Sequence, residues 1–524
     1  MRADDWIYAG EGNNSIAIAN NDVHVDDDLY GCLLIIPKLR RDGLHDRVPP
    51  LDVGHYVQYI ENVMRPWFTN SYVSDRMELI ELDDVFLSEI ASRIVDHRPL
   101  GRLKCDSPLI LSSSACIQRN FNVIYRMRPT IGSEGIRYTN THNTYLSIEL
   151  KVKSGLKGTS PFIPESRNIK RRFTKFFLTQ LHKKSRVSSL GTDQSWGIFV
   201  EESTYDPALL FSGNYHNVKS SLCRLFKVPQ NNLKVKVNNK HLYGLDKVDM
   251  NHLLEGLSSL HVSPAVTSSS NSSDAVVLDI VIDCLSSVLS EECILPRLEA
   301  MQKLDLLDVE GCEVVYNRLL QLFRGSHVEL ETYLLECFSS PLDGTIIEFM
   351  SGFDKSRLRK KCPSSGLQLP GIIVELASCQ VDNSMPIDTI QMLHYTAIGL
   401  IEKEASIDHL ALLLKMWMMS LIAKDVSLMV TLQPVVVSRA ADNTNTKEPM
   451  DQVGKRMQLQ DSLSCGVVCP IGVVDSLPGD PLMMFFYSVG ILDIGLKPIS
   501  KIWTKNKVEE AFCSQCIRLF EISS

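Results

Sequence analysis

The sequence predicts an α+β protein in which strands open the chain and helices and strands are mixed after them. Three observations support this fold class. Residues 6–8 are an apolar run, and Ile16 and Ile18 alternate with small residues, which is the period of two that a strand requires. Helical periodicity follows at 56–64 and 86–95, and a buried strand is predicted at 426–432. With 524 residues, the chain is long enough for two or three domains or for one large two-lobed enzyme.

The first strands flank a glycine-rich turn. Residues 6–8 lead into Gly10-Glu11-Gly12-Asn13-Asn14, residues 16–18 return, and residues 33–36 form a third strand. Glycine lets the backbone approach an anion closely and point its N–H groups at it. The turn could therefore cradle a nucleotide phosphate, and an ordinary hairpin turn explains it equally well.

The middle of the chain is predicted to contain short strands and a basic helix. Residues 109–111 form a short buried strand that ends in Ser112-Ser113-Ser114. A strand at 145–153 comes next, followed by a basic helix near 168–184. Helices are then expected at 280–289 and 296–306, the second with proline in its first turn.

Irregular segments separate these elements from the last strands. The Ser-rich stretch 262–274 and the polar stretch 438–462 are expected to be flexible loops. Residues 324–406 show only weak periodicity. A final buried strand is predicted at 485–496, in addition to the one at 426–432.

Composition restricts the class of protein. A net charge of -8 argues against a general or specific nucleic-acid binder, so any basic site must be local. The beginning of the chain is polar rather than signal-like, and 14 cysteines follow no regular framework, which predicts free thiols in the cytoplasm or nucleus. The apolar runs 410–422 and 482–492 are too short to span a bilayer. We expect a monomer without a membrane span.

The strand at 145–153 carries an unusual set of charges. Glu149, Lys151 and Lys153 alternate with Leu150 and Val152, so the three charged side chains share one face. Burying three charges is costly unless each has a partner. A highly phosphorylated ligand would be such a partner, and a solvated edge strand is the alternative.

The basic helix offers a second polyanion site. Residues 170–184 include Lys175 and Lys183, which could project away from an apolar stripe of Phe173, Phe177 and Leu181. A solvated helix face, a nuclear-import patch and a membrane-surface helix are the other interpretations.

Two aspartates lie at the ends of predicted buried strands. Asp425 precedes the strand at 426–432, and Asp493 closes the last apolar run. An acidic residue in such a place is suited to holding Mg²⁺ or to accepting a hydroxyl proton. Each could also be an ordinary turn residue or helix cap.

Together these segments resemble the inositol-pentakisphosphate 2-kinase family, and the similarity extends from about residue 5 to about residue 501. The segments that carry it are Trp6-Ile7-Tyr8-Ala9-Gly10-Glu11-Gly12, Glu149-Leu150-Lys151-Val152-Lys153, Tyr205-Asp206-Pro207, Leu210-Phe211-Ser212-Gly213, Pro229-Gln230-Asn231-Asn232, Gln302-Lys303-Leu304-Asp305, Asp308-Val309-Glu310-Gly311, Ala423-Lys424-Asp425 and Asp493-Ile494-Gly495-Leu496-Lys497-Pro498. The motif around Glu149 and the Pro-Gln-Asn-Asn run are the most specific.

The resemblance implies a two-lobed kinase that uses ATP and Mg²⁺ to phosphorylate the 2-hydroxyl of inositol pentakisphosphate, giving inositol hexakisphosphate (phytate). It implies a small, mainly β N-terminal lobe at about 1–111 and a larger mixed lobe at 112–524 that carries the inositide pocket. A catalytically weak or inactive member that only binds inositol phosphates is the alternative. A basic-helix scaffold for membranes or RNA is more remote.

The resemblance also assigns roles to individual residues. Asp425 would deprotonate the 2-hydroxyl and Asp493 would bind Mg²⁺. The residues implied for ATP are Gly12, Asn13, Asn14, Ser15, Ser112, Ser113, Ser114, Glu149, Lys151 and Lys234. The residues implied for the inositide are Arg40, Arg102, Lys153, Lys183, Asn231, Lys497 and Lys501.

The chain departs from the family pattern at several positions. Ile35 stands where the family supplies an arginine to ATP, and Lys38 could replace it only if the local path shifts. Val152 replaces the motif proline. The zinc ligands implied for plant members are missing, so we expect no zinc there. A different four-thiolate site would need Cys465, Cys469, Cys513 and Cys516, for which free thiols are the better prediction.

Overall fold

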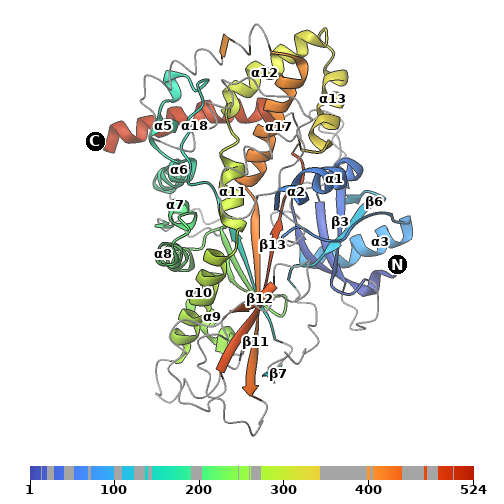
Figure 1. The fold of residues 1–524 in the computed structure, drawn as a ribbon, viewed down its shortest axis with the longest axis vertical. Helices are drawn as coiled ribbons and strands as arrows, with labels where there is room; N and C mark the ends of the chain where they lie inside the picture. The colour runs from blue at the N-terminus through green and yellow to red at the C-terminus, as the bar shows by residue number, and fades with distance from the viewer. Residues whose placement is uncertain are drawn as a thin grey trace.

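The computed structural model describes most of the chain. The described residues are 1–12, 15–20, 29–39, 52–68, 72–98, 109–122, 136–139, 144–190, 203–245, 247–258, 260, 273–342, 398–399, 401, 405–439, 465–468, 482–497, 499 and 501–523. Within them, helices and two antiparallel sheets confirm the predicted α+β class, with the smaller sheet beside the upper half of the larger one (Figure 1).

The first sheet is antiparallel and has the strand order β1-β2-β3-β6-β4, with β5 paired to β3. Its strands are β1 (Trp6–Glu11), β2 (Ser15–Asn20), β3 (Cys32–Leu39), β4 (Met77–Glu81), β5 (Ile110–Leu111) and β6 (Ser114–Arg119). The first three confirm the strands predicted around the glycine-rich turn. β6 begins after residue 111, so this sheet extends beyond the lobe boundary implied by the family resemblance.

One face of the first sheet packs on a single helix, α3 (Asp84–Ile94). Ile16 and Ile18 of β2 alternate inward toward it and are fully buried. The carboxylate of Asp83 accepts a 2.8 Å hydrogen bond from the Phe86 N–H and caps the helix at its beginning. This small core keeps the strands around the glycine-rich turn in place.

Three short helical segments lie between β3 and β4 and pack against the rest of the molecule. They are α1 (Val53–Tyr59), the π-helical η2 (Ile60–Met64) and α2 (Arg65–Phe68). Their apolar residues belong to the large core, and the indole N–H of Trp67 donates to the Arg297 carbonyl at 3.1 Å. The connection is therefore packed against the larger unit.

The second sheet is also antiparallel, in the order β10-β9-β8-β11-β13-β12, with β7 paired to β11. Its strands are β7 (Ile136–Thr139), β8 (Leu146–Lys151), β9 (Leu233–Val237), β10 (Lys240–Gly244), β11 (Ser427–Arg439), β12 (Cys465–Val468) and β13 (Leu482–Leu492). The strands predicted at 145–153, 426–432 and 485–496 are confirmed as β8, β11 and β13, although β13 ends at Leu492.

Helices cover the second sheet and extend above it (Figure 1). They are α5 (Ile169–Arg172), α6 (Lys175–Leu190), α7 (Pro207–Leu210), α8 (Tyr215–Lys227), α9 (Met250–Ser258), α10 (Ser273–Glu291), α11 (Ile294–Gln302), α12 (Asp308–Leu322), α13 (His327–Ser339), α17 (Ile407–Ala423) and α18 (Lys501–Ser523). The predicted basic helix is interrupted at Phe173, between α5 and α6. Of the two predicted loops, 262–274 and 438–462, residues 262–272 and 440–462 lie outside the described residues.

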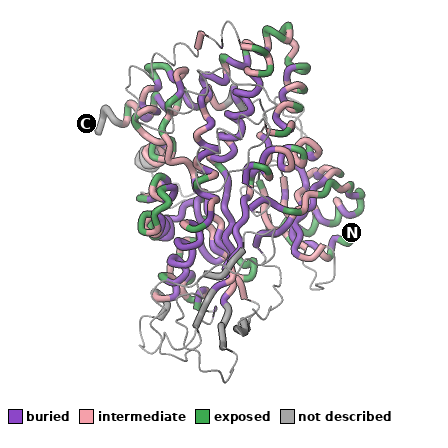
Figure 2. Tube along the Cα trace, in the orientation of Figure 1, coloured by how far each residue is buried: buried purple, intermediate pink, exposed green. Residues whose placement is uncertain are grey.

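Helix α17 is the centre of the large core. Nearly all its side chains are buried, as the tube through the middle of Figure 2 shows. Among these buried side chains Lys415 carries a charge. Its ammonium donates to the carbonyls of Cys337 at 3.0 Å and Ser340 at 2.7 Å. These carbonyls lie at the end of α13, so the buried charge caps a neighbouring helix. Of the helices described, none has the length and apolar character needed to cross a membrane.

Gly490 is a sensitive position in this core. A Cβ atom added there would lie 2.2 Å from the ring of Phe121, which is only 3% exposed. We expect Gly490→Ala to lower the free energy of unfolding by about 1–3 kcal/mol, because the ring or the strand must move.

Urea unfolding of the variant and of Gly10→Ala measures this effect. A Cβ at Gly10 would meet nothing within 4 Å, so that variant is the control. Equal stability of the two variants would contradict the packing argument.

Candidate functional site

Several of the predicted site residues lie at one end of the second sheet. β8 ends at Lys151, β11 begins at Ser427 and β13 ends at Leu492, and Ser427 is paired with both of the others. Antiparallel pairing thus places the carboxyl ends of two strands beside the amino end of the strand between them. Asp425 and Asp493, predicted from separate parts of the sequence, consequently leave the sheet at the same edge.

Two carboxylates converge on the hydroxyl group of Ser427. Its Oγ lies 3.2 Å from Oε1 of Glu149 and 3.4 Å from Oδ2 of Asp493. Ser427 is fully buried, whereas Asp493 is exposed. The backbone of Asp493 has φ +62°, which turns the chain sharply after β13. Sequence reasoning did not single out Ser427, although its place two residues after Asp425 was a possible signal.

Glu149 is held by lysines of the neighbouring strand. Lys234 of β9 lies directly across from it, and their side chains form a 2.9 Å ion pair. Burial alone would raise the pKa of Glu149, but the charges of Lys234, Lys236 and Lys151 hold it below its ordinary value. Lys236 was not predicted, yet the alternation Lys234-Val235-Lys236 repeats the signal found in β8.

Lys153 and Asp425 form the second ion pair of the site. The ammonium of Lys153 lies 2.9 Å from Oδ1 of Asp425. Burial opposes ionisation of Asp425, but Lys153, Lys151 and Lys497 lower the pKa of its carboxyl group. Asp425 therefore stays a carboxylate in neutral solution. Lys153 has φ +58°, an uncommon conformation for a residue with a side chain.

Lys183 reaches the same region from α6. Its ammonium donates a 2.8 Å hydrogen bond to the side-chain oxygen of Gln230, in the turn before β9. Gln230 also exchanges hydrogen bonds with Gln180. Burial and then the charge of Lys153 lower the pKa of Lys183, so two cations lie close enough to repel each other. An anion bound between them would relieve that repulsion.

The glycine-rich turn is braced from within the first sheet. The N–H of Gly12 donates to the Ser15 carbonyl at 2.9 Å, and Lys38 donates to the Gly12 carbonyl at 2.7 Å. Lys38 also pairs at 2.8 Å with Glu11, whose fully buried carboxylate is held at 2.9 Å by Arg98. Lys38 therefore supports the turn.

Two of the predicted hinge serines, Ser112 and Ser113, lie between β5 and β6 of the first sheet, and Ser114 is the first residue of β6. The N–H of Ser112 donates to the Pro37 carbonyl at 2.9 Å, and the Ser113 carbonyl accepts from Leu82 at 2.8 Å. The hydroxyl of Ser114 donates to Glu81 at 2.5 Å.

For the remaining predicted residues, the structure gives a location and, for some, an exposure. Asn231 is exposed in the turn before β9, and Lys497 is half-buried after β13. Lys501 is the first residue of α18, and its side chain lies outside the description. The other predicted residues outside the described part of the chain are Asn13, Asn14, Arg40 and Arg102.

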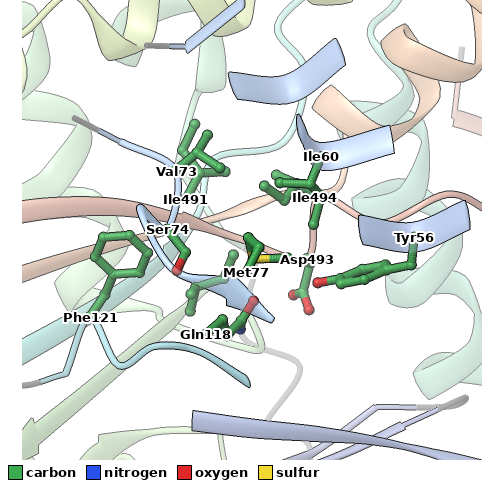
Figure 3. Close-up of a pocket in the computed structure, with 11 residues that line it drawn as sticks. Tyr56, Ile60, Val73, Ser74, Met77, Gln118, Phe121, Ile491, Asp493 and Ile494 are labelled. Atoms are coloured by element: carbon green, nitrogen blue, oxygen red, sulfur yellow. The ribbon is translucent and has the colours of Figure 1, made fainter. Parts of the chain in front are cut away.

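A small pocket lies where α1 and the first sheet meet the end of β13. Figure 3 shows the ring of Tyr56 directed toward the carboxylate of Asp493, with Met77 and Gln118 on the other side. Gly495 permits this approach, since a Cβ there would lie 2.4 Å from the Tyr56 ring. The turn that carries Asp493 is therefore packed against the N-terminal part of the chain.

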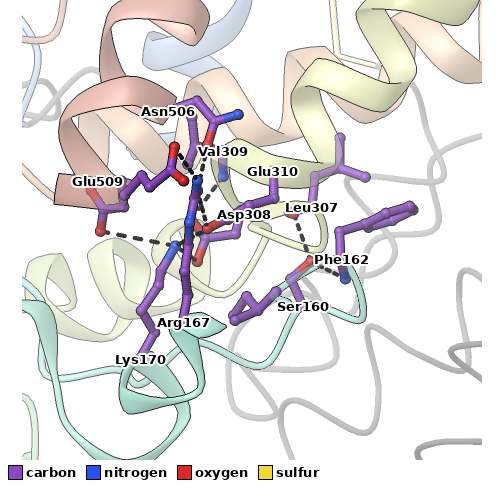
Figure 4. A network of polar contacts seen from close by, with 12 residues as sticks. Ser160, Phe162, Arg167, Lys170, Leu307, Asp308, Val309, Glu310, Asn506 and Glu509 are labelled. Carbon is purple, nitrogen blue, oxygen red and sulfur yellow. Dashed lines mark hydrogen bonds and ion pairs between the residues drawn. The ribbon is translucent and has the colours of Figure 1, made fainter. Parts of the chain in front are cut away.

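The basic segment before Lys183 does not act as one surface. Lys170 is buried and contacts Asp308 at 2.8 Å and Glu310 at 3.0 Å (Figure 4). Lys175 pairs with Glu509 at 2.5 Å. Lys175 projects from α6 with 62% of its side chain exposed, and α18 supplies a carboxylate partner for it, so its part in a polyanion site stays a prediction. The cluster joins α5, α12 and α18.

Cys513 and Cys516 of α18 are buried free thiols. They pack with Ile169 and Leu178, and burial raises the pKa of Cys513 to about 12 and that of Cys516 to about 11. Protonated thiols are poor metal ligands. In the described ranges, no group of three or more His, Cys, Asp or Glu residues is arranged to hold a metal ion; Cys469 and the side chain of Cys465 lie outside them.

Comparisons with known proteins agree on one family. The family model described as inositol-pentakisphosphate 2-kinase matches residues 8–511. An Arabidopsis thaliana protein of that name is 26% identical over 350 residues, which are 61% of this chain and 70% of the relative. One from Oryza sativa subsp. indica is 22% identical over 368 residues, covering 65% and 76%.

A Danio rerio protein of the same name is 25% identical over 270 residues, which are 49% of each chain. The alignment thus spans about half of that relative. The family model, by contrast, covers nearly all of the present sequence. This chain belongs to the inositol-pentakisphosphate 2-kinase family and is a kinase.

Proposed function

We propose that the protein transfers the γ-phosphoryl group of ATP to the 2-hydroxyl of inositol pentakisphosphate and so forms inositol hexakisphosphate. The observation that carries the proposal is the convergence of Asp425, Asp493 and several lysines at one edge of the second sheet. A substrate with many phosphates needs many cations in one place, and a protein of net charge -8 must concentrate them.

In this proposal the inositide lies beside the Lys153–Asp425 pair. Lys153 and Lys183 repel each other in the free protein, and phosphates bound between them would remove that cost. Lys497 adds further positive charge near Asp425. Asn231, Lys501, Arg40 and Arg102 complete the proposed set on the strength of the family resemblance.

The nucleotide would lie between the glycine-rich turn and Glu149. Gly12 to Ser15 would cover its phosphates, and Ser112 to Ser114 would lie beside the adenine. Lys151 and Lys234 would pair with phosphate oxygens, since each already carries its charge next to Glu149.

The acidic residues at the sheet edge fit a hard divalent cation. Mg²⁺ is commonly bound through one or two carboxylates together with substrate phosphates. Asp493 and Glu149, which share the hydroxyl of Ser427, offer such oxygens, and Asp493 is the more exposed of the two. When bound, the ion would neutralise charge on the transferred phosphoryl group.

Asp425 is the proposed acceptor of the 2-hydroxyl proton. Its lowered pKa keeps it ionised at neutral pH, and more than half of its side chain is exposed, at 59%. Lys153 would hold a substrate phosphate beside it and so orient the hydroxyl group. Phosphoryl transfer depends mainly on such positioning and on charge.

The assignment of Asp493 to the metal predicts a separation of turnover from binding. We expect Asp493→Ala to lower kcat by about a hundredfold or more, because a metal ion supplies several kcal/mol. Binding of inositol pentakisphosphate, measured by calorimetry without nucleotide, should survive. Wild-type turnover in the variant would refute the assignment.

The assignment of Lys183 predicts an effect on one substrate. Lys183→Ala should raise KM for the inositide about tenfold to a hundredfold, the value of a charge-assisted hydrogen bond, and leave KM for ATP nearly unchanged. Steady-state kinetics with each substrate varied in turn measures both constants.

Lys240→Ala is the matched control, because Lys240 is exposed at the tip of the β9–β10 hairpin. An increase confined to KM for ATP would move Lys183 to the nucleotide site.

Ile35 offers a test of the nucleotide side. It is only partly buried, whereas Leu34 and Ile36 point into the core with α3, so Ile35 lies on the opposite face of β3. We expect Ile35→Arg to strengthen ATP binding by about 1–3 kcal/mol, the range of charge-assisted hydrogen bonds.

Titration of ATP into the variant and into wild type, together with the melting temperature of each, tests this expectation. Unchanged ATP affinity with a lower melting temperature would mean that the new arginine is buried without a partner. That result would contradict the placement of the phosphates near this face.

A further inference from the structure

One buried carboxamide joins the two segments that carry Lys153 and Asp425. Gln302 ends α11 and is only 1% exposed. Its Nε2 donates to the Lys153 carbonyl at 3.0 Å and to the Ala423 carbonyl at 3.1 Å. An amide NH₂ group has two hydrogens, so it can serve both acceptors at once.

Both accepting carbonyls lie where the regular hydrogen-bond pattern of a helix or strand has ended. Ala423 is the last residue of α17, where carbonyls have no partner within the helix. Lys153 has left β8 with φ +58°, a conformation that persists only when the surroundings impose it. Gln302 supplies the missing donor in both cases.

Two further contacts join the end of α11 to the end of α17 and the residues that follow it. The hydroxyl of Ser420, in the last turn of α17, donates to the Gln302 carbonyl at 2.7 Å. Asp305 pairs at 2.5 Å with Lys424, the residue before Asp425. Asp305 also accepts from the N–H of Asp308, which anchors it to the cluster in Figure 4.

The contribution of the Gln302 carboxamide comes from its NH₂ group and not from its oxygen. This oxygen is buried and has no hydrogen-bond partner among the described residues. Burying an unsatisfied oxygen is costly, and an apolar side chain of similar volume would avoid that cost. The two hydrogen bonds from Nε2 are what such a side chain could not provide.

We infer that Gln302 is a positioning residue whose carboxamide holds Lys153 and Asp425 at the separation at which their side chains pair. The inference rests on the proposed function, in which Asp425 accepts the proton of the substrate hydroxyl group. Gln302 touches no reacting atom in this arrangement. It acts through the backbone carbonyls of Lys153 and Ala423, which its carboxamide binds.

Loss of the carboxamide should be visible in the titration of Asp425. This carboxylate faces Lys151 and Lys153 at the end of β8 and Lys497 after β13, while Lys424 beside it is engaged by Asp305. If Lys153 moves away, less positive charge stabilises the carboxylate and its pKa rises. Activity that needs the ionised form would then be lost at a higher pH than in wild type.

Gln302→Met tests the inference, because methionine is similar in volume and donates no hydrogen bond. We expect kcat to fall roughly tenfold, as for two lost hydrogen bonds, and the acidic limb of its pH profile to move to higher pH. Gln321→Met on the exposed side of α12 is the matched control and should behave as wild type.

A second measurement does not depend on turnover. The carboxyl carbon of Asp425, labelled with ¹³C and assigned with Asp425→Asn, reports its titration by NMR at a temperature where each variant is folded. A higher Asp425 pKa in Gln302→Met supports the inference. An unchanged pKa and an unchanged pH profile would overturn it, even if the variant melts earlier. Absence of turnover in wild type would instead overturn the proposed function.

Discussion

Positive charge gathered at one sheet edge is the constraint on which the site depends. Lys151 and Lys234 come from adjacent strands, Lys153 follows the end of β8, and Lys183 reaches the turn before β9 from α6. Like charges at such distances repel, so each ammonium needs an anion or a dipole. Glu149 holds Lys234, Asp425 holds Lys153 and Gln230 holds Lys183.

These partners have a second consequence for the proposed chemistry. The lysines that neutralise Glu149 and Asp425 also lower the pKa values of both carboxyl groups. In the proposed function, the acids that keep the free site together are therefore ionised and ready for a metal or a proton. Exchange of these contacts for phosphates would leave the strand ends in place.

A second group of charges has a structural role. Lys170 is buried among Asp308, Glu310 and Glu509 and joins helices from distant parts of the chain. It differs from Lys153 in exposure, at 8% against 22% of the side chain, and in being surrounded by several carboxylates. Through Asp308 and Asp305 it supports the turn before Asp425.

The sequence predicted the central features of this arrangement because they depend on local patterns. Alternation marked β8, an aspartate just before a buried strand marked Asp425, and one that closes an apolar run marked Asp493. Pairing across the fold was not predictable. The ion pair of Lys175 with Glu509 is an example, since Glu509 lies on a helix at the other end of the chain. The bracing of Gly12 by Lys38 and the role of Gln302 depend likewise on contacts that no local period encodes.

The most direct test of the central claim is a turnover measurement on the wild-type protein. Incubation with ATP, Mg²⁺ and inositol pentakisphosphate, followed by ³¹P NMR of the inositide, identifies both the product and the position of the new phosphate. The account predicts inositol hexakisphosphate formed by transfer to the 2-hydroxyl. Tight binding of inositol pentakisphosphate without any hexakisphosphate would contradict it and indicate a binding protein.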